Sequence, residues 1–464
     1  MNVKSHMTVA DSLSFVEQDE GPLALQDGSR VAVIGAGPAG SFFAFFLLKM
    51  ARTINLSIEV DIYEPRTFGS GGPASCNHCG GIVSESLVQI LAAEGINLPA
   101  SVIRRGIDSY VVHTDVGEVA ISSPAHERRI AALYRAKGPR GVADVARAGF
   151  DEFLQDMTLE QGARVVRRLV TDIRRGKNRP EVVTNDGHVE PYDLVAVATG
   201  VNSNLLSSIG DPSLDTPAPN TTRTYICEFR ATEEDIATWL GESMHVFLLP
   251  IPRLEFAAII PKNEFATVVM LGEDLDQELV HTFLRTPAVR RCLPVDHMPC
   301  VCSCSPLINT GRRGRAYADR QVFIGDSGTT RLYKDGIGAA FRTSKAAAAT
   351  AIFQGISAEA FERHYWPTCR TIERDNAIGK WLFTGARLVK NSIVSRRAIV
   401  RMAGREQRRP GGARPMSSML WNLFTGSAPY REILREAVHP GFVGKLMFNM
   451  AAGLRRTPRE REAS

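Results

Sequence analysis

A glycine-rich turn between an apolar strand and an apolar helix constrains the fold of this chain more than any other stretch. The run Val31 to Ile34 predicts a buried strand, and Gly35, Gly37 and Gly40 follow it in the spacing G-x-G-x-x-G. Gly35 permits the sharp turn, Gly37 lets the backbone approach an anion, and Gly40 lets the following helix pack closely. The first free N–H groups of that helix would face the phosphates of a dinucleotide.

A second strand, Ile58 to Glu64, is predicted after that helix and ends in an acid. Glu64 lies 24 residues beyond Gly40, close to the roughly 20 residues expected for a carboxylate that hydrogen-bonds a ribose hydroxyl. Because strand, helix and acid stand together, we interpret the glycines as a nucleotide site rather than as a turn without a ligand.

The bulk composition is that of a globular protein of two or three domains. The chain has 464 residues, of which 44% are hydrophobic and 23% charged. We see neither a basic start followed by an apolar run nor an apolar stretch of about 18 residues, and therefore expect a cytoplasmic protein without a signal peptide or spanning helix. Its eight cysteines are then expected to be reduced thiols.

The order of strand and helix patterns predicts an α/β fold. We expect a Rossmann-like dinucleotide-binding domain interleaved with an antiparallel β-sheet substrate domain, followed by a helical segment, because short alternating strands without long helices interrupt the first pattern. The expected regions are a flexible tail in 1–28, the dinucleotide-binding domain in 29–220 with inserted sheet strands near 105–125, the antiparallel domain in 221–304, a return to the first domain in 305–360 and a basic helical segment in 361–464.

Four motifs occur in a fixed order along the chain. They are the glycines already named, Arg147-x-x-Phe150-Asp151-x-x-Leu154, Asp193 to Thr199-Gly200, and Gly325-Asp326 with Gly336-Ile337-Gly338. This set resembles the FAD-dependent oxidoreductases of the para-hydroxybenzoate hydroxylase fold. Within that superfamily, Cys79-Gly80-Gly81 is similar to an element of the geranylgeranyl reductase family.

The resemblance implies FAD as the cofactor. It implies that the first glycines hold the pyrophosphate, that Glu64 holds the adenosine ribose, and that the backbone of the last motif approaches the isoalloxazine ring, where N–H donors and a helix N-terminus would stabilise the reduced flavin. The implied cofactor-binding residues are Gly35, Gly37, Gly40, Glu64, Arg147, Thr199, Gly200, Gly325, Asp326, Gly336, Ile337 and Gly338. Gly336 and Gly338, with Cys79 beside the substrate, are also the implied catalytic residues.

The reaction implied by the resemblance is hydride transfer from reduced flavin to an alkene of an isoprenoid-type or other hydrophobic substrate, with NADPH or NADH as the reductant. Two alternatives stay open: an FAD-dependent aromatic monooxygenase, and a membrane-docked flavoprotein that carries electrons to quinone. The family's aromatic strand beside the lipid pocket is matched here only by Phe256-Ala-Ala-Ile-Ile-Pro261, which has no tryptophan. The polar, cationic stretch Ser327 to Lys334 would suit a different substrate head or a diphosphate.

The cysteines allow several interpretations. Cys79, with Cys76 three residues earlier, is a substrate-pocket cysteine, half of a redox dithiol or a packing residue. Cys300, Cys302 and Cys304 alternate, which places them on one face of a strand, and we favour packing against a core because their spacing lacks the two-residue gap typical of zinc knuckles. We therefore predict no metal site.

The segment 361–464 is basic, with 20 Lys and Arg against 8 Asp and Glu. Aromatic and apolar residues interleaved with arginine are typical of an interfacial helix on an anionic membrane, and equally of a helical subdomain packed on the substrate sheet. We expect no nucleic-acid partner, because no known nucleic-acid module accompanies the charge.

Overall fold

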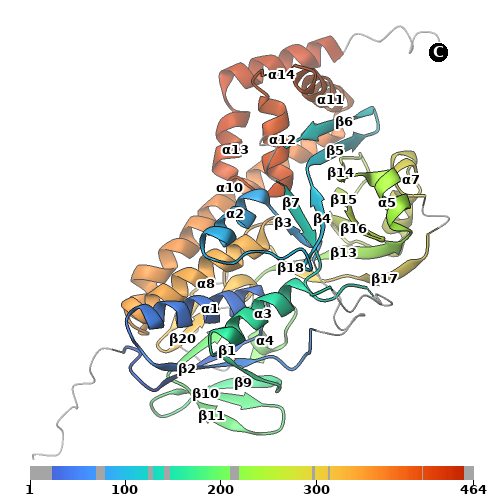
Figure 1. Ribbon diagram of the computed structural model, residues 1–464. Coiled ribbons are helices and arrows are strands. Elements are labelled where there is room, and N and C mark those ends of the chain that lie inside the picture. The colour runs from blue at the N-terminus through green and yellow to red at the C-terminus, as the bar shows by residue number, and fades with distance from the viewer. Residues whose placement is uncertain are drawn as a thin grey trace, which may run out of the picture.

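The computed structural model describes residues 23–68, 79–123, 129–139, 147–208, 219–294, 298–311, 314–409 and 411–453. A parallel, Rossmann-like sheet, a larger mainly antiparallel sheet and a set of C-terminal helices make up the fold (Figure 1). The predicted fold class is confirmed. In the described ranges, the search for a helix long and apolar enough to cross a membrane finds none.

The parallel sheet is built around the strand that precedes the glycine turn. Its order is β19 (Tyr317–Ala318), β20 (Gln321–Phe323), β12 (Leu194–Val197), β1 (Ser29–Ile34), β2 (Ile58–Tyr63) and β8 (Arg164–Val166), and only β19 runs antiparallel to its neighbour. Val31, Ala32 and Val33 are fully buried, as expected for a strand covered on both faces.

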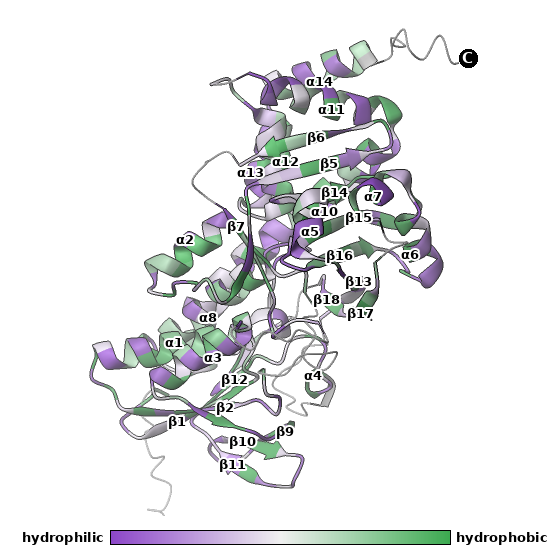
Figure 2. Ribbon diagram, turned by 45° about the vertical axis from the view of Figure 1, so that its right-hand side comes forward, coloured by the Kyte–Doolittle hydropathy of each residue, from purple (hydrophilic) through white to green (hydrophobic). Residues whose placement is uncertain are grey.

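Three helices cover one face of this sheet and a small sheet covers the other (Figure 1). The helices are α1 (Pro38–Thr53), α3 (Phe150–Glu160) and α8 (Gly336–Phe353), and the small sheet consists of β9 (Val170–Arg175), β10 (Pro180–Thr184) and β11 (Val189–Pro191). The ring of Phe42 on α1 makes edge contacts with Phe341 at 5.5 Å and Phe150 at 6.5 Å between centroids. Figure 2 shows how apolar α1 is between these neighbours.

The second, larger sheet is mainly antiparallel. Its order is β17 (Cys300–Cys304), β13 (Thr221–Arg230), β16 (Phe265–Gly272), β15 (Leu254–Lys262), β14 (Ser243–Phe247), β5 (Ser109–Thr114) and β6 (Gly117–Ser122), with β18 (Leu307–Asn309) also on β13. Only the β14–β5 pair is parallel among these described pairs. The predicted strands near 105–125 are β5 and β6. A three-stranded sheet of β3 (Ile82–Val83), β7 (Ile130–Leu133) and β4 (Ile103–Ile107) lies beside α2 (Glu85–Ala93).

Both faces of the large sheet are buried. Alternate residues of β15 show this: Ala257 and Ile259 pack in one apolar cluster, and Ala258 and Ile260 in another. The first cluster includes residues of α5 (Glu233–Leu240), α6 (Gln277–Leu284) and α7 (Pro287–Cys292), and the second includes residues of α11 (Ile393–Gln407) and α12 (Pro415–Thr425). The sheet therefore separates two cores.

The C-terminal helices pack on the rest of the protein. They are α9 (Ala358–Ala360) with a π-helical turn (Phe361–Tyr365), α10 (Trp366–Asn391), α11, α12, α13 (Tyr430–Ala437) and α14 (Pro440–Gly453); the short α4 (Leu205–Ser208) lies elsewhere. Trp421 of α12 contacts Tyr110 of β5 with 5.0 Å between ring centroids. Of the two interpretations of this segment, packing on the substrate sheet therefore holds for α12.

Two expectations need correction. Residues 23–28 were predicted to lie in a flexible tail, yet Leu25 is buried and the carbonyl of Leu23 accepts a hydrogen bond of 2.7 Å from Ile356; residues 1–22 lie outside the described residues. Cys300, Cys302 and Cys304 do form a strand, but Cys300 is exposed and the other two are half-buried. The packing prediction was wrong because β17 is an edge strand of the sheet.

Candidate functional site

The glycine turn has the geometry that its spacing predicts. Gly35 has a φ of +103°, and a Cβ built there would lie 2.8 Å from the carbonyl oxygen of Ala198. A Cβ on Gly40 would lie 1.9 Å from the carbonyl oxygen of Gly35. Side chains at either position would collide with backbone, so the turn and the close helix contact require glycine.

Arg135 covers the N-terminus of α1. A Cβ on Gly37 would lie 2.9 Å from Nη2 of Arg135, so the guanidinium stands where the helix start points. Asp151 of α3 holds it by two hydrogen bonds, Nη2–Oδ2 at 2.6 Å and Nε–Oδ1 at 3.1 Å. Burial alone would lower the pKa of Arg135, but the Asp151 carboxylate outweighs it and the pKa lies above its usual value. A fixed positive charge therefore adds to the helix dipole at this point.

Sequence reasoning missed Arg135 because the residue follows β7 and belongs to none of the motifs considered. The residue predicted to contact the FAD was Arg147, which lies in the coil directly before α3. The cofactor contact of Arg147 stays a prediction. Asp151, the residue that orients Arg135, did belong to a predicted motif. The acid was therefore visible in the sequence while its partner was not.

Glu64 lies beside the glycine turn, as expected for the end of β2. Its side chain is almost fully buried, and Oε2 accepts a hydrogen bond of 3.3 Å from the backbone N–H of Ala36. Oε1 accepts from Nε of Arg66 at 3.0 Å. The carboxylate is thus held at the carboxyl edge of the parallel sheet, where open α/β sheets bind their ligands; its contact with a ribose stays a prediction.

The motifs from the two halves of the chain meet at the same edge. Gly325 has a φ of +59°, and a Cβ there would lie 2.6 Å from the Cβ of Ala39 on α1. The backbone N–H of Gly200, after β12, donates to Oγ of Ser327 at 2.8 Å. Burial raises the pKa of Asp326, against the effects of its Thr330 hydrogen bond and the Arg135 charge. Thr199, Gly200, Gly325 and Asp326 therefore gather around the turn.

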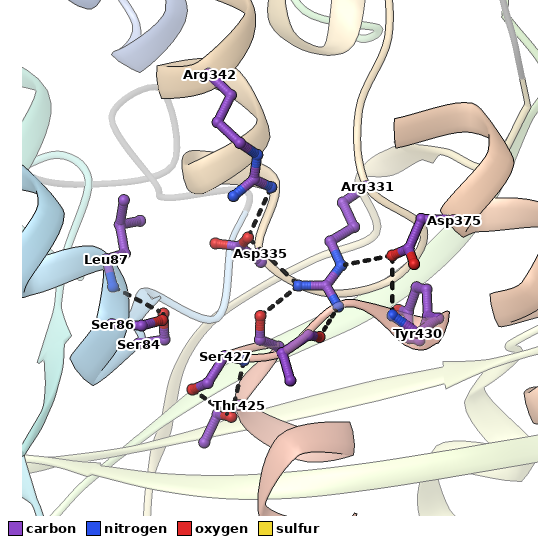
Figure 3. Close-up of polar contacts among 12 residues, drawn as sticks. Ser84, Ser86, Leu87, Arg331, Asp335, Arg342, Asp375, Thr425, Ser427 and Tyr430 are labelled. Carbon is purple, nitrogen blue, oxygen red and sulfur yellow. Dashed lines mark hydrogen bonds and ion pairs between the residues drawn. The ribbon is translucent and has the colours of Figure 1, made fainter. Parts of the chain in front are cut away.

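The start of α8 is shaped by Asp335. Its φ of +56° is left-handed, and a Cβ on Gly338 would lie 2.1 Å from Oδ1 of Asp335, so a side chain there would displace the Asp335 carboxylate. Asp335 accepts a hydrogen bond of 2.9 Å from Arg342 and pairs with Arg331 at 3.5 Å (Figure 3). Gly336 and Ile337 open the helix.

Cys79 lies between β7 and the large sheet. The N–H of Gly81 donates to its Sγ at 3.3 Å, and Gly81, with a φ of +68°, would place a Cβ 1.9 Å from the carbonyl oxygen of Leu133. A Cβ on Gly80 would lie 3.2 Å from Val269 of β16. Cys79 also interacts electrostatically with Arg135, which links it to the turn. Cys76 lies outside the described residues.

Lys334 supplies an amine next to the start of α8. Its Nζ lies 4.1 Å from the ring centroid of Phe256 on β15 and 6.0 Å from that of Phe424 on α12. Burial lowers its pKa to about 7. The sequence showed a cationic stretch here but not that aromatic rings from two distant elements surround this lysine.

A cavity of about 480 Å³ lies at α10, away from these motifs. It is lined by Thr310, Gly311, Trp366, Arg370, Glu373, Arg374, Asn376, Ala377 and Lys380. This lining contains no residue of the predicted cofactor set, so the cavity does not bear on that prediction.

The comparisons with known proteins find a shared fold. No family model and no curated protein matches the sequence. The halogenase PltM, in complex with phloroglucinol and FAD, matches with a TM-score of 0.57 and 14% identity over 94% of this chain and 92% of that one. The flavin-dependent brominase Bmp2 matches with a TM-score of 0.55 and 15% identity over 91% and 93%. A variant of 2-methyl-3-hydroxypyridine-5-carboxylic acid oxygenase matches with a TM-score of 0.55 and 14% identity over 79% and 94%.

Proposed function

We propose that this chain is an FAD-dependent oxidoreductase that acts on a hydrophobic organic substrate. The observation that carries the proposal is the guanidinium of Arg135, fixed by Asp151 over the N-terminus of α1. This arrangement offers backbone donors, a helix dipole and a cation to a diphosphate. The complex of the structurally similar PltM with FAD supports the same choice of cofactor.

The residues around the turn fit the parts of FAD. The glycine turn and Arg135 would hold the diphosphate, Glu64 the adenosine ribose, and the N–H groups at Gly336 to Gly338 the polar edge of the flavin ring. Bound FAD supplies the redox chemistry. The chain's own part is to orient the cofactor and to place Cys79 and Lys334 on the substrate side, where the lysine amine, with a pKa of about 7, can hold or release a proton near neutral pH.

Oxygen-dependent oxidation of an aromatic substrate is the reaction with the most support. PltM is a halogenase whose complex contains phloroglucinol, and another similar structure is that of an oxygenase of a hydroxypyridine carboxylic acid. The Lys334 amine, which lies beside the rings of Phe256 and Phe424, would suit an aromatic substrate that carries a phenolate or carboxylate. The second candidate is alkene reduction of an isoprenoid-type substrate, which is favoured by the Cys79-Gly80-Gly81 element against the large sheet.

The first experiment asks whether the protein holds flavin. The purified protein is expected to show a flavin spectrum that bleaches on anaerobic titration with NADPH or NADH. A colourless protein that takes up no FAD from a tenfold excess would overturn the proposed function. Flavin that neither nicotinamide reduces would instead indicate a different electron donor.

The second experiment separates the reactions. Reduced enzyme is mixed with phenolic substrates under labelled dioxygen, and with geranylgeranyl diphosphate under argon after reduction by deuterated nicotinamide. Labelled oxygen in the phenolic product supports oxidation, and deuterium in the lipid supports alkene reduction. Reoxidation by a water-soluble quinone without either product would indicate the electron carrier.

We also propose that α14 contacts an anionic membrane surface. Val443, Met447 and Phe448 are 41%, 60% and 67% exposed on this helix, with Lys445 exposed among them, as in an interfacial helix. Sedimentation with phosphatidylserine vesicles is expected to be lost in Phe448→Asp and to persist in Leu159→Asp, a matched change at an exposed position of α3. Equal sedimentation of both variants would contradict this contact.

A further inference from the structure

Three metal-ligating side chains converge inside the large sheet. His113 comes from β5, His245 from β14 and Cys292 from the end of α7. His113 Nε2 lies 2.9 Å from His245 Nδ1 and 3.5 Å from Cys292 Sγ, and the three ligand atoms all lie within 4.8 Å of one another. All three side chains are at least nine-tenths buried. The parallel pairing of β5 with β14 brings the histidines together although 132 residues separate them.

The outer nitrogens of both imidazoles face acceptors. His245 Nε2 lies 3.2 Å from the carbonyl oxygen of Leu240, and because a carbonyl only accepts, Nε2 carries the proton and Nδ1 keeps its lone pair. The His245 tautomer is thus assigned from its contact. His113 Nδ1 lies 3.0 Å from Oε2 of Glu118, but among the described residues it has no partner at hydrogen-bond geometry, so this contact does not fix the tautomer of His113. In the metal-free protein His113 Nε2 can donate to His245 Nδ1 across 2.9 Å; with the proton of His113 on Nδ1 instead, two nitrogen lone pairs face the same point and can both bind a cation.

We propose that His113, His245 and Cys292 bind a zinc ion. Two imidazole nitrogens and one sulfur are a donor set that zinc prefers, with bonds of about 2.0 Å to nitrogen and about 2.3 Å to sulfur. Donor atoms at those lengths around a tetrahedron lie roughly 3.3 to 3.6 Å apart. The separation of 3.5 Å between His113 Nε2 and Cys292 Sγ falls in this range, and the two nitrogens, 2.9 Å apart, would move slightly apart when the ion binds. Metal-bound histidines commonly give their other N–H to a carboxylate or a carbonyl, which are the partners that Glu118 and Leu240 provide.

The three proposed ligands differ in protonation. Burial lowers the pKa of both histidines to about 4, with a smaller contribution from Arg291 at His113 and from His113 at His245, so both are neutral ligands at neutral pH. Zinc binds cysteine as the thiolate, so the Cys292 thiol would release its proton to solvent as the Zn–S bond forms. The fourth position of the tetrahedron is then open to water.

The zinc would lie apart from the proposed redox site. Cys292 packs in the apolar cluster that contains Ala257 and Ile259, whereas Ala258 and Ile260 face the other cluster, with Phe424. The sheet therefore lies between the zinc ligands and Lys334. The ion would tie the short helix α7 to the β5–β14 pair.

The zinc content is measured on the full-length protein as purified, with or without bound flavin. Protein expressed in zinc-supplemented medium and dialysed against metal-free buffer is expected to retain about one zinc per chain by mass spectrometry of the elements, and X-ray absorption at the zinc edge is expected to show nitrogen and sulfur ligands. Fewer than about 0.1 equivalents of zinc after addition of excess and dialysis would overturn the proposal.

Variants locate the ion. Cys292→Ser combined with His245→Asn is expected to lower retained zinc at least tenfold, whereas Cys302→Ser, a change at a cysteine of the same sheet, is expected to leave it unchanged. Zinc retained by the folded double variant would overturn the assignment. Anomalous diffraction from crystals of the unmodified protein gives the answer if the variant does not fold, because a zinc peak elsewhere also contradicts it. None of these readouts depends on FAD.

Discussion

The guanidinium carbon of Arg331 lies 4.7 Å from the ring centroid of Tyr430. Arg331 belongs to the stretch that leads into α8, and Tyr430 begins α13. The same guanidinium donates hydrogen bonds to the carbonyls of Gly426 and Ala428 (Figure 3). The hydroxyl of Tyr430 donates to the carbonyl of Leu332. The C-terminal helices are therefore fastened to the segment that carries the proposed flavin contacts.

Replacement of Arg331 by methionine is expected to lower both stability and FAD affinity. The change leaves two buried carbonyls without their donor and Asp335 without one of its cations, a loss of about 3 to 5 kcal/mol for a buried ionic network. Denaturant unfolding measures the stability and fluorescence titration the affinity. Arg363→Met is the control, because Arg363 forms an exposed ion pair with Glu359 worth about 0.5 kcal/mol at most. Equal losses in the two variants would contradict the role of Arg331.

Replacement of Arg135 by glutamine is expected to weaken FAD binding and also to lower stability, because it leaves the buried Asp151 carboxylate without its cation. A charge-assisted contact to a phosphate contributes about 1.5 to 3 kcal/mol, which corresponds to a dissociation constant raised roughly 10- to 100-fold. Asp151→Asn is expected to act in the same direction, because it releases the guanidinium. Arg129→Gln, at an exposed arginine near β7, is the control. Unchanged affinity in Arg135→Gln would remove the main support for the proposed function.

The glycine turn and its surroundings could be predicted from the sequence because their requirements are local. Gly35 has a positive φ, and Gly40 brings the start of α1 close to the backbone of Gly35. Glu64 ends the next strand of the same unit. Such signals lie within about 30 residues of each other.

The residues that sequence reasoning missed act over long separations. Arg135 reaches the turn only because β7 ends beside α1, and half-buried Lys334 meets aromatic rings only because β15 and α12 bring Phe256 and Phe424 to it. His113, His245 and Cys292 carry no motif spacing, because the pairing of β5 with β14 and the position of α7 bring them together. The expectation of no metal site came from cysteine spacing alone, which cannot detect a cluster of this kind.

The stability of the protein is expected to depend on pH through Lys334. Burial lowers its pKa from 10.5 to about 7, so between pH 7 and pH 10.5 the unfolded chain binds a proton that the folded protein does not. Stability therefore rises with pH across this window and is flat below it, as far as this group is concerned. Lys334→Met removes the effect, so the variant is expected to gain most over the unmodified protein at pH 6 and least near pH 10.

Thermal unfolding at pH 6, 7.5 and 9 measures this difference. Lys380→Met, at an exposed lysine of α10, is expected to show no change in the difference with pH. If the advantage of Lys334→Met is the same at pH 6 and pH 9, Lys334 is charged in the folded protein throughout this range, and its proposed proton-holding role fails with it.

Cys300 is expected to be the thiol that alkylates fastest near neutral pH among the described cysteines. Its pKa is lowered to about 7, mainly because Cys227 donates a hydrogen bond to its sulfur, and it is the cysteine that lies exposed on β17. Because the thiolate is the nucleophile, the rate with iodoacetamide, followed by mass spectrometry of the Cys300 peptide, is expected to reach half its maximum near pH 7. Cys227→Ala removes the donor and is expected to move that midpoint upward toward the ordinary thiol value, whereas Cys369→Ala, at another buried cysteine, leaves it in place. A midpoint that does not move in Cys227→Ala would assign the reactivity to exposure alone.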